Sequence, residues 1–375
     1  MPAIQRLQAF VFRWPVRVPV RTSFGTMHDR PAVLVRVEDA EGAHGWGEVW
    51  CNFPSCGAEH RARLVEAVVA PLLCGRQWAS PAAVYETLTQ QTAVLALQSG
   101  EPGPIAQAIA GVDIAMHDLA ARRAGVPLWR ALGGSGSEVE VYASGINPDR
   151  PGDVVTALRG AGYTRFKLKV GFGSERDLAN LQAMRAAAPG ATLMVDANQA
   201  WDLATATTMA AQLAPLQPAW LEEPLRADRP WAEWQALAAA SAVPLAAGEN
   251  MIGDAAFDGL IASRAFAVVQ PDLAKWGGVS GVLGVIERIA RAGQRYCPHY
   301  LGAGIGLLAS AHVLAARGAA DGLLEIDSNE NPLRNALAPA LASLRAGRID
   351  IGSAPGLGVE PDLDRCRDLC APRHD

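Results

Sequence analysis

A series of charged residues recurs at nearly constant spacing through the second half of the sequence. Starting from Lys169, it continues in steps of 27, 26, 27, 23, 27 and 26 residues through Asp196, Glu222, Glu249, Asp272, His299 and Glu325. Each stands near the end of a short run of strand-forming residues, and an Ala- and Leu-rich stretch with helical spacing follows. One strand and helix of a (β/α)₈ barrel take up roughly 30 residues. The spacing therefore predicts that these side chains share the mouth where the strands end.

Three members of the series are acids at the ends of successive runs: Asp196, Glu222 and Glu249. Neighbouring carboxylates repel one another, so they need protons or a cation. Mg²⁺ prefers oxygen ligands and leaves positions for a substrate, so we expect these acids to bind Mg²⁺. The alternative is a separate local salt bridge for each acid. Glu223, the next residue after Glu222 in a strand, should point into the wall behind the site.

The stretch TRFKLKVGFG places Lys167 and Lys169 two residues apart, and in a strand both then face the same side. Positive neighbours favour a neutral amine, so Lys169 is predicted to act as a base. Lys167 would hold a substrate carboxylate and adjust the pKa of Lys169. The alternative is a lysine that pairs with an acid of the barrel.

On the opposite side, His299 follows Asp272 by one repeat, so their side chains can meet. A carboxylate behind an imidazole fixes its tautomer and raises its basicity, which makes His299 a second candidate base or acid. Glu325 comes next around the mouth. If protonated, it could donate a hydrogen bond to a developing oxyanion, and the nearby acids should raise its pKa.

Together these residues offer two bases with a cation between them. A substrate carboxylate would bind the cation, and the proton α to that carboxylate would become acidic because the enediolate is stabilised. Magnesium with a Lys or His base is a known solution to this chemistry.

The strands and helices that must position these side chains can also be predicted from the sequence. Eight β-rich runs, the first at 139–146 and the last at 321–327, indicate a closed (β/α)₈ barrel over residues 131–345. Before them, 31–49 reads as two strands joined by a turn, and helical spacing follows. We therefore expect an N-terminal α+β domain at residues 1–130, with glycines after PLWRALGG at the boundary.

Composition excludes several classes of protein. The 375 residues carry a net charge of −5 and no basic block, so neither nucleic acid nor a membrane is an expected partner. The six cysteines include no CxxC pair or zinc spacing, which indicates free thiols. There is no apolar run of roughly 18–20 residues and no signal-peptide core, so a soluble cytoplasmic protein is expected.

At these residues the sequence resembles the enolase superfamily, and within it the mandelate racemase subgroup. The resemblance covers nearly the whole chain and rests on KLK, VDANQAW, LEEP, GEN, QPDLAKWGG, PH, GVDIAMHDLAARRAGVPLWRALGG and PGLGVEPD. It implies a capping domain on a modified TIM barrel, with residues 346–375 returning to the cap. It also implies Asp196, Glu222 and Glu249 as Mg²⁺ ligands, Lys169 and His299 as bases, Asp272 as the support of His299, and Glu325 beside the enediolate.

One position separates subgroups of this family. Muconate-lactonising-like members carry a lysine base at the sixth strand end, where this chain has Asp272, so the resemblance favours the Lys–His version. Lys275 is common to both groups. Two reactions of a small-molecule carboxylate then fit: dehydration of a hydroxy acid or acid sugar to a 2-keto acid, ranked first, or racemisation or epimerisation. A non-catalytic metal-binding barrel is a remote third reading.

The resemblance also implies where specificity lies, in two cap loops near Arg21–His28 and Trp50–His60. The candidate substrate contacts are Arg21, Ser23, His28, Asn52, Phe53, Asn198 and Trp276. Packing is the alternative role for each. A homo-oligomer, a dimer or an octamer, is expected from the resemblance alone.

Overall fold

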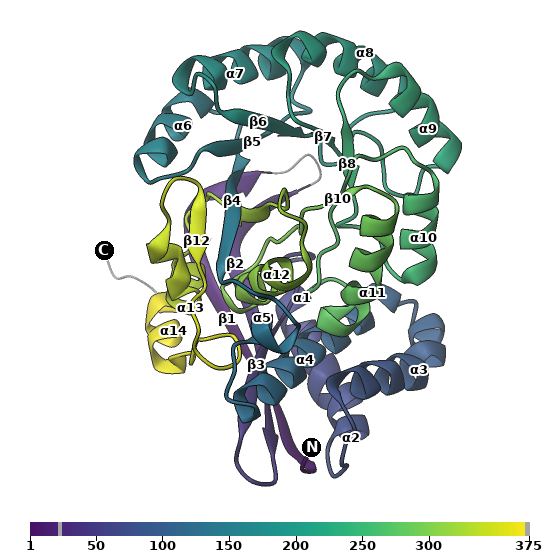
Figure 1. Cartoon of the computed structure of the whole chain (residues 1–375), viewed down its shortest axis with the longest axis vertical. Helices are drawn as coiled ribbons and strands as arrows, with labels where there is room; N and C mark the ends of the chain where they lie inside the picture. Colours follow the sequence, from purple (N-terminus) through teal and green to yellow (C-terminus); the bar gives the residue numbers. More distant parts are fainter. Residues whose placement is uncertain (22–24, 372–375) are drawn as a thin grey trace.

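The computed structural model describes residues 1–21 and 25–371, with only the backbone at Arg21. Its N-terminal part is an antiparallel sheet in the order β1-β2-β3, packed against helices (Figure 1). The strands are β1 (Ile4–Arg21), β2 (Thr26–Asp39) and β3 (His44–Val49). The helices are α1 (Gly57–Leu64), a π-helical turn at Val65–Val69, α2 (Ala70–Leu73), α3 (Pro81–Ser99), α4 (Pro102–Arg123) and α5 (Leu128–Ala131). The expected N-terminal α+β region is present.

The two strands predicted within 31–49 are β2 and β3, and Asp39 closes the turn between them by accepting from the amides of Glu41 and Ala43. The long strand β1 was not predicted. Prolines at positions 15 and 19 lack the amide hydrogen that a ladder uses, but β1 is an edge strand, where proline is tolerated.

All eight predicted runs form the parallel strands of one sheet. Hydrogen-bonded ladders run in the order β10-β9-β8-β7-β6-β5-β4-β11, with helices around the outside (Figure 1). The strands are β4 (Glu138–Ile146), β5 (Arg165–Lys169), β6 (Thr192–Asp196), β7 (Leu221–Glu222), β8 (Leu245–Ala247), β9 (Val268–Val269), β10 (Arg295–Tyr296) and β11 (Leu324–Asp327). The helices that follow the first seven strands are α6 (Pro151–Gly160), α7 (Ser174–Ala187), α8 (Leu203–Leu213), α9 (Trp231–Ala240), α10 (Asp254–Ala262), α11 (Gly278–Arg291) and α12 (Ile305–Arg317).

Two details depart from the closed, regular barrel that the sequence predicts. Within the described residues no ladder joins β10 to β11, so the hydrogen-bonded sheet stays open there. The helix after β11 is short, α13 (Pro332–Leu337), and a 3₁₀ turn at Pro339–Ser343 follows it. The fold is therefore a TIM-like parallel barrel with a modified last unit, capped by an antiparallel sheet.

The strand register determines which side chains reach the mouth. Lys169 pairs with Asp196, and Asp196 pairs with Glu222, so these three residues lie level on neighbouring strands. One layer deeper, Lys167 pairs with Met194. Met194 belongs to a buried cluster that fills the barrel interior: Tyr142, Met194, Trp220, Ala246, Val268, Cys297 and Leu323. This apolar layer is the floor beneath the site.

The C-terminal segment contacts both domains. Strand β12 (Arg348–Asp350) pairs antiparallel with β4, and helix α14 (Leu363–Cys370) lies beside β1 (Figure 1). Glu360 accepts from the indole of Trp46 at 2.9 Å and contacts Arg122 at 2.8 Å. The exact domain boundaries at 130 and 345 stay predictions. Among the described residues, no helix is long and apolar enough to cross a bilayer.

Candidate active site

A cavity of about 220 Å³ opens at the C-terminal ends of the barrel strands, where the capping domain covers them. Several predicted site residues line it: Phe53, Lys169, Asp196, Asn198, Glu249, His299 and Glu325. Lys167 and Asp272 lie behind this lining and contact its residues Glu325 and His299, and Glu222 contacts Lys167. The structure thus brings the whole predicted series together.

Lys167 is the most deeply buried cation of the site, with 1% of its surface exposed. Its Nζ lies 2.5 Å from Glu222 Oε1, 2.7 Å from Glu325 Oε1, and 5.3 Å from the centre of the Tyr142 ring. Burial opposes its charge, but Glu222 and Glu325 raise the pKa of Lys167 well above its ordinary value. Lys167 is therefore a fixed positive charge between two acids.

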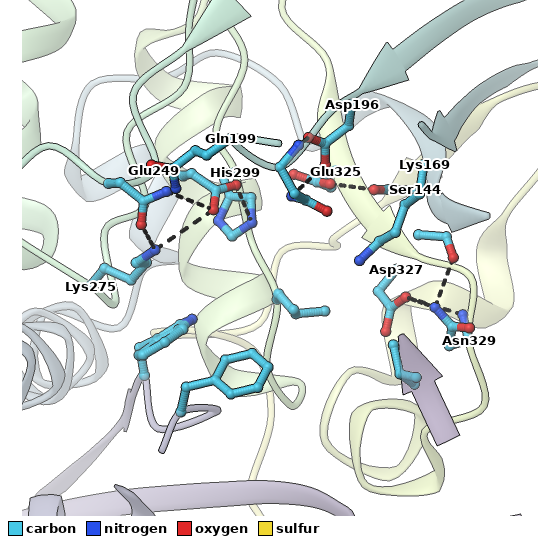
Figure 2. A pocket seen from close by; sticks show the side chains of 17 residues that line it. Ser144, Lys169, Asp196, Gln199, Glu249, Lys275, His299, Glu325, Asp327 and Asn329 are labelled. Carbon is cyan, nitrogen blue, oxygen red and sulfur yellow. Dashed lines mark hydrogen bonds and ion pairs between the residues drawn. The ribbon is translucent and has the colours of Figure 1, made fainter. Parts of the chain in front are cut away.

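Lys169 and His299 lie on opposite sides of the cavity, with Asp196 and Glu325 between them in the view of Figure 2. His299 Nδ1 is 2.7 Å from Asp272 Oδ2, and His299 Nε2 is 2.9 Å from Glu249 Oε2. Asp272 Oδ1 accepts from the amides of Ala274 and Lys275. Asp272 is thus held by its own loop and fixes the His299 ring with one nitrogen facing the cavity. Burial alone would lower the pKa of His299, yet the surrounding acids, Glu249 foremost, raise it well above the usual value.

The acids of the site carry more negative charge than their partners offset. Burial, followed by repulsion from Asp196, Glu325 and Glu249, raises the pKa of Glu222 to about 7 despite the opposing charge of Lys167. The pKa of Asp196 is also raised, chiefly by burial and then by Glu249, against the opposing lysines. A divalent cation would relieve this excess, and a set of carboxylate oxygens suits Mg²⁺.

In the described residues, no three Asp, Glu, His or Cys side chains lie close enough together to hold a metal ion as they stand. Each carboxylate bonds a nearby donor: Asp196 bonds Asn198, Glu249 bonds His299, and Glu222 bonds Lys167, Trp220 and Gln270. Their strands remain adjacent, so the residue types and their placement fit a magnesium site.

The expectation that neighbouring acids raise the pKa of Glu325 is wrong. Burial does raise it, but Lys167 and His299 outweigh burial, and the pKa of Glu325 lies below its ordinary value. The hydroxyl of Ser144 also donates to Glu325 Oε1. The sequence could not show that Lys167 pairs directly with this acid.

The backbone is unusual where the acids meet. Asn198, Gln199 and Glu223 have positive φ angles of 42°, 65° and 39°, and the Gln199 amide donates to the Glu223 carbonyl at 2.7 Å. Such left-handed non-glycine residues cluster at functional sites. Glu223 itself is buried and does not line the cavity. Its carboxylate accepts from Asn250 Nδ2, and burial together with Glu249 raises its pKa well above the ordinary value.

Several lining residues were not predicted: Val20, Trp50, Ser144, Gly145, Gln199, Asn250, Lys275, Leu301, Asp327 and Asn329. Ser144, Asn250 and Asp327 stand at or near strand ends, so the rule that identified the charged series could have found them. The lysine content of the chain is a stronger signal for this site. The chain contains only three lysines, Lys167, Lys169 and Lys275, and all belong to this site. The Nζ of Lys275 bonds Asn250 Oδ1 at 2.7 Å and lies over the Trp50 ring.

Three expected substrate contacts lie elsewhere in the structure. Asn52 donates to the Leu301 carbonyl at 2.6 Å and is buried outside the cavity lining. Trp276 packs against Phe257 and lines a separate apolar cavity against the capping helices. His28 is exposed on β2. In the sequence these three residues lie close to the strands and loops of the mouth. In the structure the side chains of Asn52 and Trp276 pack outside the cavity, and that of His28 faces solvent. Ser23 and the Arg21 side chain lie outside the described residues.

Comparison with protein families agrees with this architecture. Residues 6–133 match the mandelate racemase / muconate lactonizing enzyme N-terminal domain, and residues 153–365 match the enolase C-terminal domain-like family. Among characterised proteins, a D-galactarolactone cycloisomerase of Agrobacterium fabrum is 30% identical over 365 residues, 92% of each chain. An L-talarate/galactarate dehydratase of Salmonella typhimurium is 36% identical over 266 residues, 69% of this chain and 64% of that protein.

Solved structures extend the similarity to the whole chain. A mandelate racemase/muconate lactonizing enzyme from Bordetella bronchiseptica is 60% identical, with a TM-score of 0.94 and coverage of 98% of this chain and 99% of that one. A racemase from Streptomyces coelicolor with bound magnesium is 25% identical, with a TM-score of 0.85 and coverage of 98% and 100%.

Proposed function

Because this chain belongs to the mandelate racemase/muconate lactonizing enzyme family of the enolase superfamily, we propose that it removes the proton α to the carboxylate of a hydroxy acid. The product of this step is an enediolate. We further propose that the substrate is an acid sugar or a similar hydroxy acid and that it is dehydrated to a 2-keto acid. The placement of Lys169 and His299 on opposite sides of one cavity carries this proposal.

Asp196, Glu222 and Glu249 would hold Mg²⁺. The bound ion would withdraw negative charge from the substrate carboxylate and so make the α proton more acidic. Lys167 supplies a positive charge behind the cavity lining, between Glu222 and Glu325, on the side where the substrate carboxylate would lie. Glu325, which contacts Lys167 and Ser144, lies between Lys169 and His299 in the view of Figure 2.

In the proposed reaction, Lys169 Nζ takes the α proton from one face of the substrate. The electron pair of the broken C–H bond forms the enediolate. The enediolate then forms a double bond between the α and β carbons as the bond between the β carbon and its hydroxyl oxygen breaks. His299 Nε2 donates a proton to the departing hydroxyl, so water leaves. Asp272 keeps Nδ1 occupied and directs Nε2 at the cavity. The resulting enol becomes the 2-keto acid.

Dehydration is ranked above its alternative for two reasons. The Salmonella relative is named as a dehydratase of sugar acids, and hydroxyl-binding side chains such as Ser144 and Asn329 line the cavity. Racemisation or epimerisation needs only the same two bases, and the Streptomyces neighbour is described as a racemase. A complete pair of supported bases argues against a non-catalytic metal-binding barrel. A homo-oligomer remains a prediction.

The test is incubation of the purified protein with Mg²⁺ and a library of hydroxy acids, acid sugars and amino acids in deuterated water, read by mass spectrometry. We expect one acid sugar or hydroxy acid to lose one water. Lys169→Ala should abolish the reaction without changing the melting temperature. Deuterium gain at the α carbon without water loss would identify a racemase or epimerase and reject dehydration.

A further inference from the structure

The segment that follows His299 rests on the capping domain. After His299 the chain runs through Tyr300 and Gly302 into helix α12. Glu48, at the end of β3 and 2% exposed, accepts from the amides of Ala303 at 2.5 Å and Gly306 at 2.9 Å. The carboxylate of Glu48, a residue of the capping domain, thus binds the first turn of α12, the helix that begins six residues after His299.

The fit between Glu48 and this segment is close. A methyl group at Gly302 would lie 2.4 Å from the Tyr300 hydroxyl oxygen and 2.8 Å from Glu48 Oε1, so only glycine allows the approach. Asn52, also from the capping domain, donates to the Leu301 carbonyl at 2.6 Å. The backbone from 301 to 306 is therefore held at three points by two capping residues.

The same kind of contact occurs in the preceding βα unit of the barrel, at the helix that follows Asp272. Asp113 on α4 is buried and accepts from the Ser280 amide at 2.9 Å and the Ser280 hydroxyl at 2.6 Å, at the start of α11. A methyl group at Gly278 would lie 2.4 Å from Asp113 Oδ2. His299 and Asp272 thus each precede a helix, and the first turn of each helix bonds a carboxylate of the capping domain.

The lysine side is built differently. Asp177, within α7, accepts at 2.8 Å from the amide of Gly171, two residues after Lys169. Asp202 caps α8 by accepting from the Thr205 amide at 2.8 Å, shortly after Asp196. Here each unit of the barrel closes its own loop.

We propose that Glu48 is a positioning residue for His299: the capping domain sets the orientation of the imidazole through the Glu48 carboxylate, whereas the loop after Lys169 is closed by Asp177 of the barrel itself. The structural part of this inference stands without the proposed function, and its effect on catalysis rests on that function. A displaced helix start would shift the segment that carries His299, and misplacement of about 1 Å can cost a hundredfold in rate.

The substrate-free test compares Glu48→Gln with Asp118→Asn. Asp118 is also a buried carboxylate of the capping domain that accepts from backbone amides, but these are the amides of Trp46 at 2.8 Å and Leu357 at 2.6 Å, neither of which belongs to the segment after His299. With ¹⁵N-labelled histidine the chain gives seven imidazoles, and His299→Asn assigns the one of interest. We expect Glu48→Gln to move the His299 resonance and to speed hydrogen exchange at the amides of Ala303 and Gly306. Asp118→Asn should change neither.

The second arm measures turnover. We expect Glu48→Gln to lower kcat about ten- to a hundredfold while KM changes less than about threefold, with exchange of the α proton by Lys169 retained. A His299 resonance and amide exchange rates at Ala303 and Gly306 that match the wild type, in a folded Glu48→Gln protein, would overturn the inference. If that variant does not fold, Gly302→Ala disturbs the same contact from the barrel side and is judged by the same resonance. Failure of every substrate would reject the proposed function only, because the resonance still decides the role of Glu48.

Discussion

The two sides of the cavity are supported in contrasting ways. Lys169 and Asp196 end five-residue strands that pair in register, and local carboxylates close the loops that follow them. His299 and Asp272 follow strands of only two ladder residues each, and the helices beyond them start on Glu48 and Asp113 of the capping domain. One base is therefore built into the barrel. The other depends on how two domains meet, so substitutions on the two sides should have separable effects.

The largest expected effect is on the barrel side. Lys167→Met leaves Glu222 and Glu325 buried without their shared cation, which should lower the free energy of unfolding by about 3–5 kcal/mol. Chemical denaturation followed by circular dichroism measures it. The control is Lys275→Met: Lys275 is less buried, bonds the neutral amide of Asn250 and lies 3.8 Å from only one carboxylate, Glu249, so its cost should be nearer 1 kcal/mol. Equal losses for both variants would contradict the assignment of Lys167 as the central buried charge.

A substitution in the histidine pair should affect chemistry more than stability. Asp272→Asn keeps the shape but presents no carboxylate to His299 Nδ1, and we expect kcat to fall roughly a hundredfold. Exchange of the α proton with deuterated water, measured by NMR, should continue because Lys169 is untouched. Loss of both activities together would mean that the two sides do not act independently.

The next effect concerns magnesium and pH. Burial raises the pKa values of Glu222 and Asp196, so in the metal-free protein these acids hold protons that the unfolded chain releases from about pH 4 upward. Their contribution to stability is full at low pH and is lost as pH rises toward about 7, where Glu222 ionises. Mg²⁺ must displace those protons, so its stabilisation should grow with pH. At a hundred times Kd it should reach about 2.7 kcal/mol.

Melting curves with and without Mg²⁺, at about pH 5.5 and about pH 8, measure this linkage. The increase in melting temperature should be larger at the higher pH and absent in Asp196→Asn. An equal increase in that variant would place the ion elsewhere.

The smallest effect tests the contact between domains. Asn52→Ala removes the hydrogen bond to the Leu301 carbonyl and should cost about 1 kcal/mol of stability and a few-fold in kcat. Its matched control on the lysine side is Asn180→Ala, which removes a bond of the same type, 2.9 Å long, to the Pro148 carbonyl. Steady-state kinetics should show reduced kcat only for Asn52→Ala. A reduced kcat in both variants would remove the distinction between the two sides.

Much of the site was predictable because the barrel repeat converts spacing into position. Steps of 23 to 27 residues brought Lys169, Asp196, Glu249, His299 and Glu325 to one cavity. Strand alternation also correctly predicted that Lys167 points inward, and the resemblance identified the capping domain. The positive φ at Glu223, directly after β7, was not indicated by the sequence.

What the sequence by itself determined is the kind of chemistry: acids, lysines and a histidine at the ends of parallel strands, because a βα unit of fixed length places each at the same mouth. Only the tertiary structure decided which partner each side chain takes. Lys167 pairs with Glu325, and Asn52 and Glu48 reach a segment about 250 residues away in the chain. Such contacts depend on how the two domains dock, and no local pattern of residues encodes that arrangement.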